Sequence, residues 1–539
     1  MTNTPKPTPT KSSQQNELHK TIWKIATELR GSIHGWDFKE YVLGIMFYRY
    51  ISENLTNYLN TNERETNAGF DYTTLSDEDA ENGREAIIQE KGFFIPPSAL
   101  FCNIVKTAAN DENLNTTLDN IFKAIEDSSR GHDSEKNVKG LFADLNVNSN
   151  KLGNTLKTRN EKLVKLLHAI DAMELGDYQN SGIDVFGDAY EYLMAMYASD
   201  AGQGGGEFFT PQEVSELLAR IVTLNKKSVN KVYDPCCGSG SLLLKFAKVL
   251  GKDNVKKGFY GQESNLTTYN LCRINMFLHD INFNKFSIAH GDTLLDPQHG
   301  DDEPFDAIVS NPPYSTKWVG DGNPLLINDP RFSPAGVLAP KDRADLAFSM
   351  HMLSWLSAQG TCAIVESIGV LYRGQNRNNA EQKIRRYLVE NNFIDCVIQL
   401  PINLFFGTGI ATCILVLKKC KTDTSTLFID ASKEYIKEGK QNKLTESNIQ
   451  KILQAYGSRQ EIAHFSTLAT LETIQANQYN LSINRYVAQK DTKESINIKT
   501  LDTDIKTLNA EIKAIVEKQT QLRKSLDTII EELEGASDA

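Results

Sequence analysis

A short segment in the middle of the chain, Asn311-Pro312-Pro313-Tyr314, combines residue types that can hold a planar ligand bearing an amino group. Two successive prolines fix the backbone and remove two N–H donors. The Asn311 side-chain oxygen and the Pro312 carbonyl could each accept one hydrogen of an NH2 group, while the Tyr314 ring stacks on the ligand face. The segment therefore predicts a site for such a ligand, in preference to a simple proline turn.

A glycine-rich turn lies upstream, in the sequence Asp234-Pro235-Cys236-Cys237-Gly238-Ser239-Gly240, between a predicted strand and a predicted helix. Glycines let a ligand approach the backbone, and the start of a helix offers free amides. The turn is not a P-loop, because no Gly-Lys-Ser/Thr follows, and Leu243 replaces the third glycine of a dinucleotide fingerprint. Taken alone, an ordinary tight turn explains this segment nearly as well.

Two acidic residues close later predicted strands. Glu263 ends the segment GFYGQE, and Asp292 ends FSIAHGD. A carboxylate at the end of the second strand can accept both ribose hydroxyls of a nucleoside, and Asp292 is placed to accept from an adenine amino group. Either residue alone could be a solvated strand end. Together with the glycine-rich turn they mark three strand ends on one edge of a sheet, which favours a nucleoside site.

The elements that would position these residues form an α/β pattern after residue 231. Helical segments separate most of the short apolar runs, which predicts a mostly parallel, doubly wound sheet. The last two runs have only about ten residues between them, which favours an antiparallel pair. The seven predicted strands lie at 232–235, 258–263, 286–292, 305–313, 360–367, 393–401 and 411–419.

The whole chain is expected to divide into four parts, of which the α/β domain is one. We expect a disordered tail at 1–15, a helical interaction domain at 16–170, the α/β domain at 171–475 and a helical region at 476–539. A Gly-rich linker begins at Ala201, and Thr210-Pro211-Gln212-Glu213 predicts a capping box with proline at the first helical position.

The C-terminal region carries apolar residues at alternating spacings of three and four, which is the a/d pattern of a coiled coil. A narrow apolar seam on a polar helix favours docking on a partner helix over packing on the chain's own domain. The pattern is interrupted once by a polar residue, Gln519. The seam residues are Ile498, Leu501, Ile505, Leu508, Ile512, Ile515, Leu522, Leu526, Ile529 and Leu533.

Composition restricts the remaining possibilities. The 539 residues contain no apolar run long enough for a membrane helix, and the polar first residues do not resemble a signal peptide, so we expect a cytoplasmic protein. The eight cysteines form no CxxC pair, and no histidine lies at metal-ligand spacing, so neither a disulfide framework nor a metal site is expected. The net charge of −11 implies that another protein supplies much of the positive charge if the ligand is nucleic acid.

One dense basic cluster lies in the segment LYRGQNRNNAEQKIRRYL. These residues could contact the DNA backbone, although a solvated helix face explains the charges almost as well. The cluster consists of Arg373, Arg377, Lys383, Arg385 and Arg386.

The glycine-rich turn and the Asn-Pro-Pro-Tyr segment together resemble the amino-methyltransferases that use S-adenosylmethionine on adenine N6 of DNA. LRGSIHGWDFKEYVLGIMFYRYISEN, DVFGDAYEYLMAMYASDAGQGGGEFFTPQEV and LPINLFFGTGIATCILVLKK resemble the modification (M) subunit of type I restriction–modification systems. The first of these is similar to the type IC subgroup. The resemblance extends over residues 15–535.

The resemblance implies a Rossmann-like methyltransferase fold with S-adenosyl-L-methionine as cofactor and no metal. It places Asp234, Gly238 and Gly240 at the methionine and ribose side of the cofactor, Glu263 at the ribose and Asp292 at the adenine. The family's FTP-type motif, which helps to enclose the cofactor, matches Phe208, Phe209, Thr210 and Pro211. The other residues implied at the cofactor are Pro235, Cys236 and Ser239, and those implied in catalysis are Asn311, Pro312, Pro313 and Tyr314.

The resemblance also implies partners: double-stranded DNA, a specificity (S) subunit that carries two M subunits and binds the C-terminal helix, and a restriction (R) subunit. The target adenine would be flipped out of the duplex, and Asn311 and Pro312 would draw its amino nitrogen towards tetrahedral geometry for direct methyl transfer. Cys236 and Cys237 are then expected to be packing residues. The chain departs from its relatives at these two cysteines and at the basic segment.

Three alternatives remain at the level of sequence. A protein glutamine methyltransferase could use the same Asn-Pro-Pro-Tyr geometry, although the helical N-terminal region and the C-terminal heptads argue against it. A binding-only subunit could retain the fold, although the intact Asn311, Tyr314, Glu263 and Asp292 argue against that. Methylation of cytosine N4 has the same geometric demands, and only the resemblance at Asn311 favours adenine.

Overall fold

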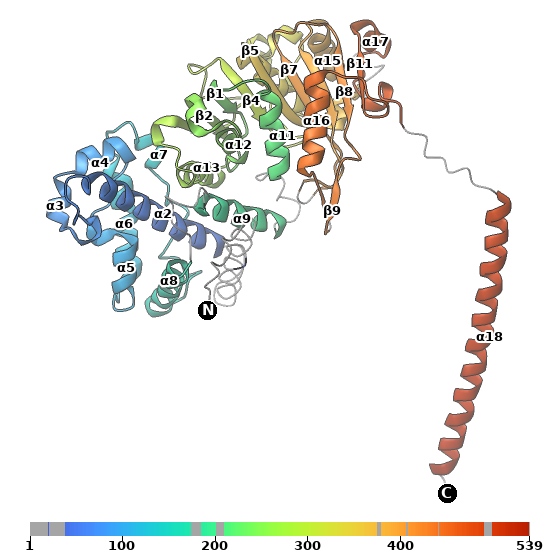
Figure 1. Ribbon diagram of the computed structural model, residues 1–539, viewed down its shortest axis with the longest axis horizontal. Coiled ribbons are helices and arrows are strands. Elements are labelled where there is room, and N and C mark those ends of the chain that lie inside the picture. Colours follow the sequence, from blue (N-terminus) through green and yellow to red (C-terminus); the bar gives the residue numbers. More distant parts are fainter. Residues whose placement is uncertain are drawn as a thin grey trace, which may run out of the picture. The chain divides into compact units, whose positions relative to one another are not determined.

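The computed structural model describes residue 20 and residues 38–173, 185–200, 210–374, 379–405, 408–439, 441–489 and 498–537. The chain forms two compact units that divide between Ala488 and Gln489, and the second contains one long helix, α18 (Ile498–Ser537) (Figure 1). A short helical turn at Ile483–Arg485 packs on the sheet of the first unit. The C-terminal region therefore begins later than the expected residue 476. Within the described ranges, no helix has both the length and the apolarity to cross a membrane.

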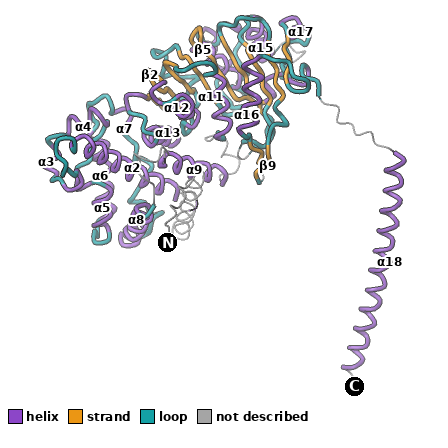
Figure 2. The backbone as a smooth tube through the Cα atoms, viewed as in Figure 1, coloured by secondary structure: helices purple, strands orange, loops and turns teal. Residues whose placement is uncertain are grey.

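Helices make up the first part of the first unit, as the sequence predicts (Figure 2). The longest, α2, buries Ile45, Met46 and Phe47 completely, and α8 begins at a capping box formed by Thr155 and Thr158. The helices are α2 (Phe38–Glu63), α3 (Asp77–Glu81), α4 (Arg84–Lys91), α5 (Phe101–Ala108), α6 (Leu114–Ser128), α7 (Glu135–Val138), α8 (Leu156–Asp171) and α9 (Val185–Asp200).

The α/β part contains all seven predicted strands, and two more extend the sheet. Its order is β11-β8-β6-β7-β5-β4-β1-β2-β3. Strands β6 and β7 pair antiparallel, as their short connection predicts, and β7 also pairs antiparallel with β5. The strands are β1 (Val229–Asp234), β2 (Val255–Glu263), β3 (Phe286–His290), β4 (Phe305–Ser310), β5 (Leu356–Ser367), β6 (Ile394–Gln399), β7 (Thr412–Lys418), β8 (Thr426–Asp430) and β11 (Ser466–Ala469), with a separate hairpin of β9 (Ile436–Glu438) and β10 (Gln441–Lys443).

Alternate side chains of the central strands enter two separate cores, as the two-residue period of a strand requires. Val232 packs in the core that contains α11, α12, α13 and α16, whereas Tyr233 packs in the core of α14, α15 and α17. The sheet is therefore covered on both faces. These helices are α11 (Gln212–Val222), α12 (Ser241–Leu250), α13 (Leu266–Leu278), α14 (Asp345–Trp355), α15 (Ala380–Glu390), α16 (Glu446–Ser458) and α17 (Leu471–Ala476).

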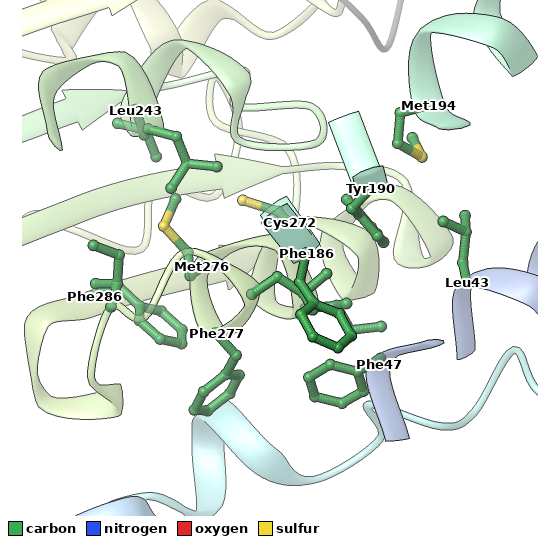
Figure 3. Packing of buried hydrophobic residues seen from close by; sticks show 14 of the residues in the cluster. Leu43, Phe47, Phe186, Tyr190, Met194, Leu243, Cys272, Met276, Phe277 and Phe286 are labelled. Carbon is green, nitrogen blue, oxygen red and sulfur yellow. The ribbon is translucent and has the colours of Figure 1, made fainter. Parts of the chain in front are cut away.

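The core on the α13 side continues without a break into the helical region (Figure 3). The ring of Phe47 on α2 lies 6.2 Å from that of Phe277 on α13, which lies 5.3 Å from that of Phe286 on β3. Because the same buried cluster includes residues of both parts, the helical region and the sheet of the first unit share one hydrophobic core.

Candidate active site

A pocket of about 290 Å³ opens where β1, β2, β3 and β4 end. Six of the predicted site residues line it: Pro235, Cys236, Glu263, Asp292, Asn311 and Pro313. Ten residues that the sequence did not single out complete its wall: Ser264, Asn265, Thr268, Gly291, Thr293, Leu294, Thr316, Lys317, Trp318 and Phe348. The carboxyl edge of the sheet thus brings together the residues that the sequence placed on separate strand ends.

The glycine-rich turn lies beneath this wall. The Gly238 amide donates to Glu263 Oε2 at 3.0 Å, and the Asn265 amide donates to Oε1 at 2.8 Å, so the turn and the next strand end are joined through one carboxylate. Gly240 has a φ of +83°, and a Cβ there would lie 2.8 Å from Cys272 Sγ, so only glycine fits. Gly238, Ser239 and Gly240 are buried and are not among the residues that line the pocket, so their contact with a cofactor stays a prediction.

Asp234 connects the end of β1 to the end of β4. Its Oδ1 accepts from the Cys236 amide at 2.9 Å and from Ser310 Oγ at 2.8 Å, while Oδ2 is buried and has no partner among the described residues. Burial raises the pKa of Asp234 to about 7, against the lowering effect of these two hydrogen bonds. The carboxyl group is only 1% exposed and does not line the pocket, so it holds the turn against Ser310 from below.

Asp292 begins the loop at the opposite side of the pocket. Its side chain is exposed, and Oδ1 accepts from the Leu294 amide at 2.9 Å. The buried Arg331 donates at 2.8 Å to each of the carbonyls of Thr293 and Leu294, and its charge is paired with Asp329. Sequence reasoning missed Arg331, because a single arginine in a long loop carries no local signal of the contacts that it makes.

Asn311 is held by two side chains. Its Nδ2 donates to Thr210 Oγ1 at 3.1 Å, and Tyr314 Oη donates to its Oδ1 at 2.6 Å. The predicted capping box is therefore wrong: α11 begins at Gln212 with Pro211 as its N-cap and no side-chain cap. The Thr210 hydroxyl bonds Asn311 instead, so the segment before α11 contacts the Asn-Pro-Pro-Tyr segment.

The aromatic surroundings of Tyr314 include a residue that the sequence did not single out. Phe405 is buried in the loop after β6, and its ring lies edge-on to that of Tyr314, with 6.2 Å between centroids. Burial raises the pKa of the Tyr314 hydroxyl well above its usual value, so the group remains a donor at neutral pH. Phe208 and Phe209, the other two aromatic residues predicted at the site, lie outside the described residues.

The helical region contacts the helix that follows Glu263. Asp144 accepts from Thr267 Oγ1 at 3.0 Å and from Asn270 Nδ2 at 3.1 Å, both on α13. The fully buried Arg273 of the same helix donates to the carbonyls of Lys136 and Lys139. Because the first turn of α13 supplies Thr268 to the pocket wall, these contacts connect the helical region to the site.

The predicted basic cluster does not form one positive surface. Arg385 is 1% exposed and donates to the carbonyls of Tyr479, Val370 and Arg373, so it stabilises the fold. Arg373 is paired with Glu381 at 2.8 Å and with Asp345 at 3.4 Å. The DNA-contact hypothesis is therefore corrected for these two arginines, whose charges are satisfied internally.

The other members of that cluster differ from one another in their surroundings. Arg386 is exposed and paired with Glu390 at 2.9 Å. Lys383 is exposed, and Arg377 lies outside the described residues. A contact of these three residues with DNA stays a prediction.

Comparisons with known proteins show the family of the chain. Residues 181–495 match the family model of the N-6 DNA methylases, and residues 18–170 match that of the HsdM N-terminal domain. The chain is 48% identical to the type I restriction enzyme MpnII methylase subunit of Mycoplasma pneumoniae, over 97% of each chain. It is 29% identical to the MjaVII methylase subunit of Methanocaldococcus jannaschii, over 97% of this chain and 85% of that one.

A solved structure extends the likeness to three dimensions. The type I restriction–modification system methyltransferase subunit from Streptococcus thermophilus matches with a TM-score of 0.79 at 36% identity. The match covers 88% of this chain and 99% of that chain.

Proposed function

We propose how the residues of this chain divide the work of a DNA methylase. The chain belongs to the N-6 DNA methylase family and is a methylase subunit of a type I restriction–modification system. It transfers a methyl group from S-adenosylmethionine to adenine N6 of DNA. The family assignment confirms the prediction of adenine methylation over the glutamine, cytosine and binding-only alternatives. The proposal for the residues rests on one observation: Asn311, Glu263 and Asp292 line a single pocket.

The pocket fits the cofactor by its chemistry. Glu263 and Asp292 place carboxylate acceptors at the ends of β2 and just after β3, suited to ribose hydroxyls and to an adenine amino group respectively. Two carboxylates also favour a cationic ligand. When bound, the cofactor supplies an electrophilic methyl group on a sulfonium. Asp234, Gly238 and Gly240 support this half of the pocket from beneath and are not part of its lining.

The target adenine is proposed to bind at the Asn311 side. Its amino group would donate to Asn311 Oδ1 and to the Pro312 carbonyl, which draws the nitrogen lone pair out of conjugation and stabilises developing positive charge. Thr210 fixes the orientation of the carboxamide, since it accepts from Nδ2. The oxygen accepts from Tyr314 and keeps a second lone pair for the base. Tyr314 stacks on the ring, with Phe405 against its edge. Orientation supplies most of the acceleration.

Cys236 and Cys237 are proposed to be packing residues. Burial raises the pKa of both thiols well above the usual value, so neither is a ready nucleophile. Cys237 fills the space beside Gly261, and Cys236 forms part of the pocket wall.

The exposed seam of α18 and the family membership support a proposal for the partner proteins. The seven described seam residues that can be assessed, from Ile505 to Ile529, are each at least half exposed, so the helix presents an apolar stripe to a partner. We infer that this stripe binds the specificity subunit, with two methylase subunits per specificity subunit and a restriction subunit in the full complex. A cytoplasmic location and the type IC subgroup remain predictions.

Methyl transfer to DNA tests the proposal. The chain alone, and the chain co-expressed with its specificity subunit, would be incubated with tritiated S-adenosylmethionine and unmodified genomic DNA, and the nucleosides separated. The proposal predicts label in N6-methyladenine that requires both subunits. Label in protein, or in N4-methylcytosine, would contradict it.

A further inference from the structure

The segment that follows Asn-Pro-Pro-Tyr is tied to the segment that precedes α14. The Trp318 amide donates to the Lys341 carbonyl, and the Ala344 amide donates to the Thr316 carbonyl, both at 2.9 Å. Gly320 permits the close approach, because a Cβ there would lie 2.9 Å from Lys341 Cα. These contacts place the backbone of Lys341 beside Trp318, the chain neighbour of Lys317, and both Lys317 and Trp318 line the pocket together with Asn311.

Lys317 and Lys341 are both exposed, and neither forms an ion pair with any residue that the structure describes. The other cations of this region are neutralised by acids. Arg343 is paired with Asp342 and Glu381, Arg373 with Glu381 and Asp345, and Arg331 with Asp329. In a chain of net charge −11, Lys317 on the pocket wall and Lys341 beside the same segment are therefore two positive charges that an anionic ligand at the pocket could meet.

We propose that Lys317 and Lys341 bind the DNA phosphates that flank the flipped target adenine. A base that leaves the duplex to reach Asn311 carries its own two phosphates to the mouth of the pocket. Lys317 lines this pocket, and Lys341 is joined to its wall through Trp318. Lysine ammonium groups contact phosphates as point charges, without sequence preference. This assignment takes the place of Arg373 and Arg385, whose charges are satisfied internally, and it rests on the proposed function.

Salt-dependent DNA binding tests the assignment. The assembled complex with the specificity subunit would carry Lys317→Ala, Lys341→Ala or both, and its Kd for DNA containing the recognition sequence would be measured at several salt concentrations. Each substitution is expected to weaken binding about threefold to tenfold and to reduce the slope of log K against log salt by about one for each methylase subunit in contact with DNA. Lys257→Ala is the matched control, because it removes an exposed lysine on the amino-terminal half of β2. It should change neither the Kd for DNA nor the salt slope.

The position of the contact is tested with modified DNA. Neutral methylphosphonates at the two phosphates beside the target adenine should weaken the wild-type complex and have little further effect on the double variant. Methylphosphonates several base pairs away should weaken both equally. An unchanged salt slope, or loss of S-adenosylmethionine binding in place of DNA binding, would overturn the assignment. A wild-type complex that transfers no methyl group to DNA would instead reject the proposed function.

Discussion

At the scale of single residues, the carboxamide of Asn311 is oriented before any substrate arrives. Thr210 accepts from its nitrogen, and Tyr314 donates to its oxygen at 2.6 Å. The oxygen has a second lone pair for the adenine amino group, but the Tyr314 hydroxyl competes for the same atom. The ring of Tyr314 and its hydroxyl are therefore expected to have opposite effects on the reaction.

Substitutions at Tyr314 separate these two effects. Tyr314→Phe keeps the stacking surface and frees Asn311 Oδ1, so kcat should be retained or should rise slightly. Tyr314→Ala removes a stacking contact of about 1–3 kcal/mol, so the methylation rate should fall roughly tenfold to hundredfold. Single-turnover methyl transfer by the assembled complex measures both. A Tyr314→Phe variant as slow as Tyr314→Ala would show that the hydroxyl is needed.

The buried carboxyl of Asp234 predicts a pH-dependent stability. Its pKa rises from 3.8 to about 7 on folding, so the folded chain holds a proton that the unfolded chain has lost between these values. The stabilisation is present below about pH 4 and is lost as the pH rises to about 7, a change of roughly 4 kcal/mol. Asp234→Asn should remove this dependence. Unfolding of the free subunit by urea at pH 5 and pH 8 measures it, and equal pH dependence in both proteins would contradict the prediction.

Residue types could be identified from the sequence more readily than their partners. Asn311, Glu263 and Asp292 carry recognisable chemistry at strand ends and were placed in one pocket. Thr210 and Arg385 were misread, because a helix cap and a surface charge are the local interpretations of these residues. Thr210 bonds Asn311, 101 residues away in sequence, which no local pattern reveals. Arg385 bonds Tyr479, 94 residues away, as well as the nearer Val370 and Arg373.

At the scale of elements, the seven strands that carry the site were predictable because each is a short apolar run flanked by helices. Strands β8 and β11 were missed. Each is only four or five residues long, and their pairing with each other at the sheet edge depends on tertiary contacts. The role of α13 was equally hidden, because its contacts with the helical region depend on Asp144 and Arg273.

The contact between Asp144 and α13 predicts a positioning role. Asp144→Ala removes two hydrogen bonds that hold the first turns of α13, so the pocket wall at Asn265 and Thr268 should loosen. The KM for S-adenosylmethionine should rise about threefold to tenfold with little change in kcat. The KM of the Asp144→Asn variant should lie between those of the wild-type and Asp144→Ala proteins. Asp119→Ala, which removes a half-buried acid of α6 that pairs with Lys123, is the control. A threefold to tenfold fall of kcat at unchanged KM would contradict this positioning role of Asp144.

At the scale of the whole molecule, the helical region and the sheet share a core, whereas α18 forms a unit of its own (Figure 1). The heptad pattern predicted this exposed helix, but the shared core was not predictable, since amphipathic helices give no indication of which sheet they cover. The two units should therefore respond independently to substitution.

Substitutions on opposite faces of α18 test this independence. Ile512→Asp places a charge in the apolar seam and should abolish assembly with the specificity subunit without altering the Tm of the free chain. Ala510→Asp places the same charge on the far face of the helix and should assemble normally. Co-purification and thermal unfolding measure the two properties. Assembly of the Ile512→Asp chain would show that another surface binds the partner.

The central claim is that Asn311 activates the adenine amino group, and the most direct test combines two measurements on Asn311→Ala in the assembled complex. Single-turnover methyl transfer is measured with tritiated S-adenosylmethionine, and cofactor binding is measured by calorimetry on the same sample. We predict a rate at least about 100-fold lower, with a cofactor Kd within about threefold of the wild-type value. A rate close to wild type, or a loss of rate that cofactor binding fully explains, would contradict this claim.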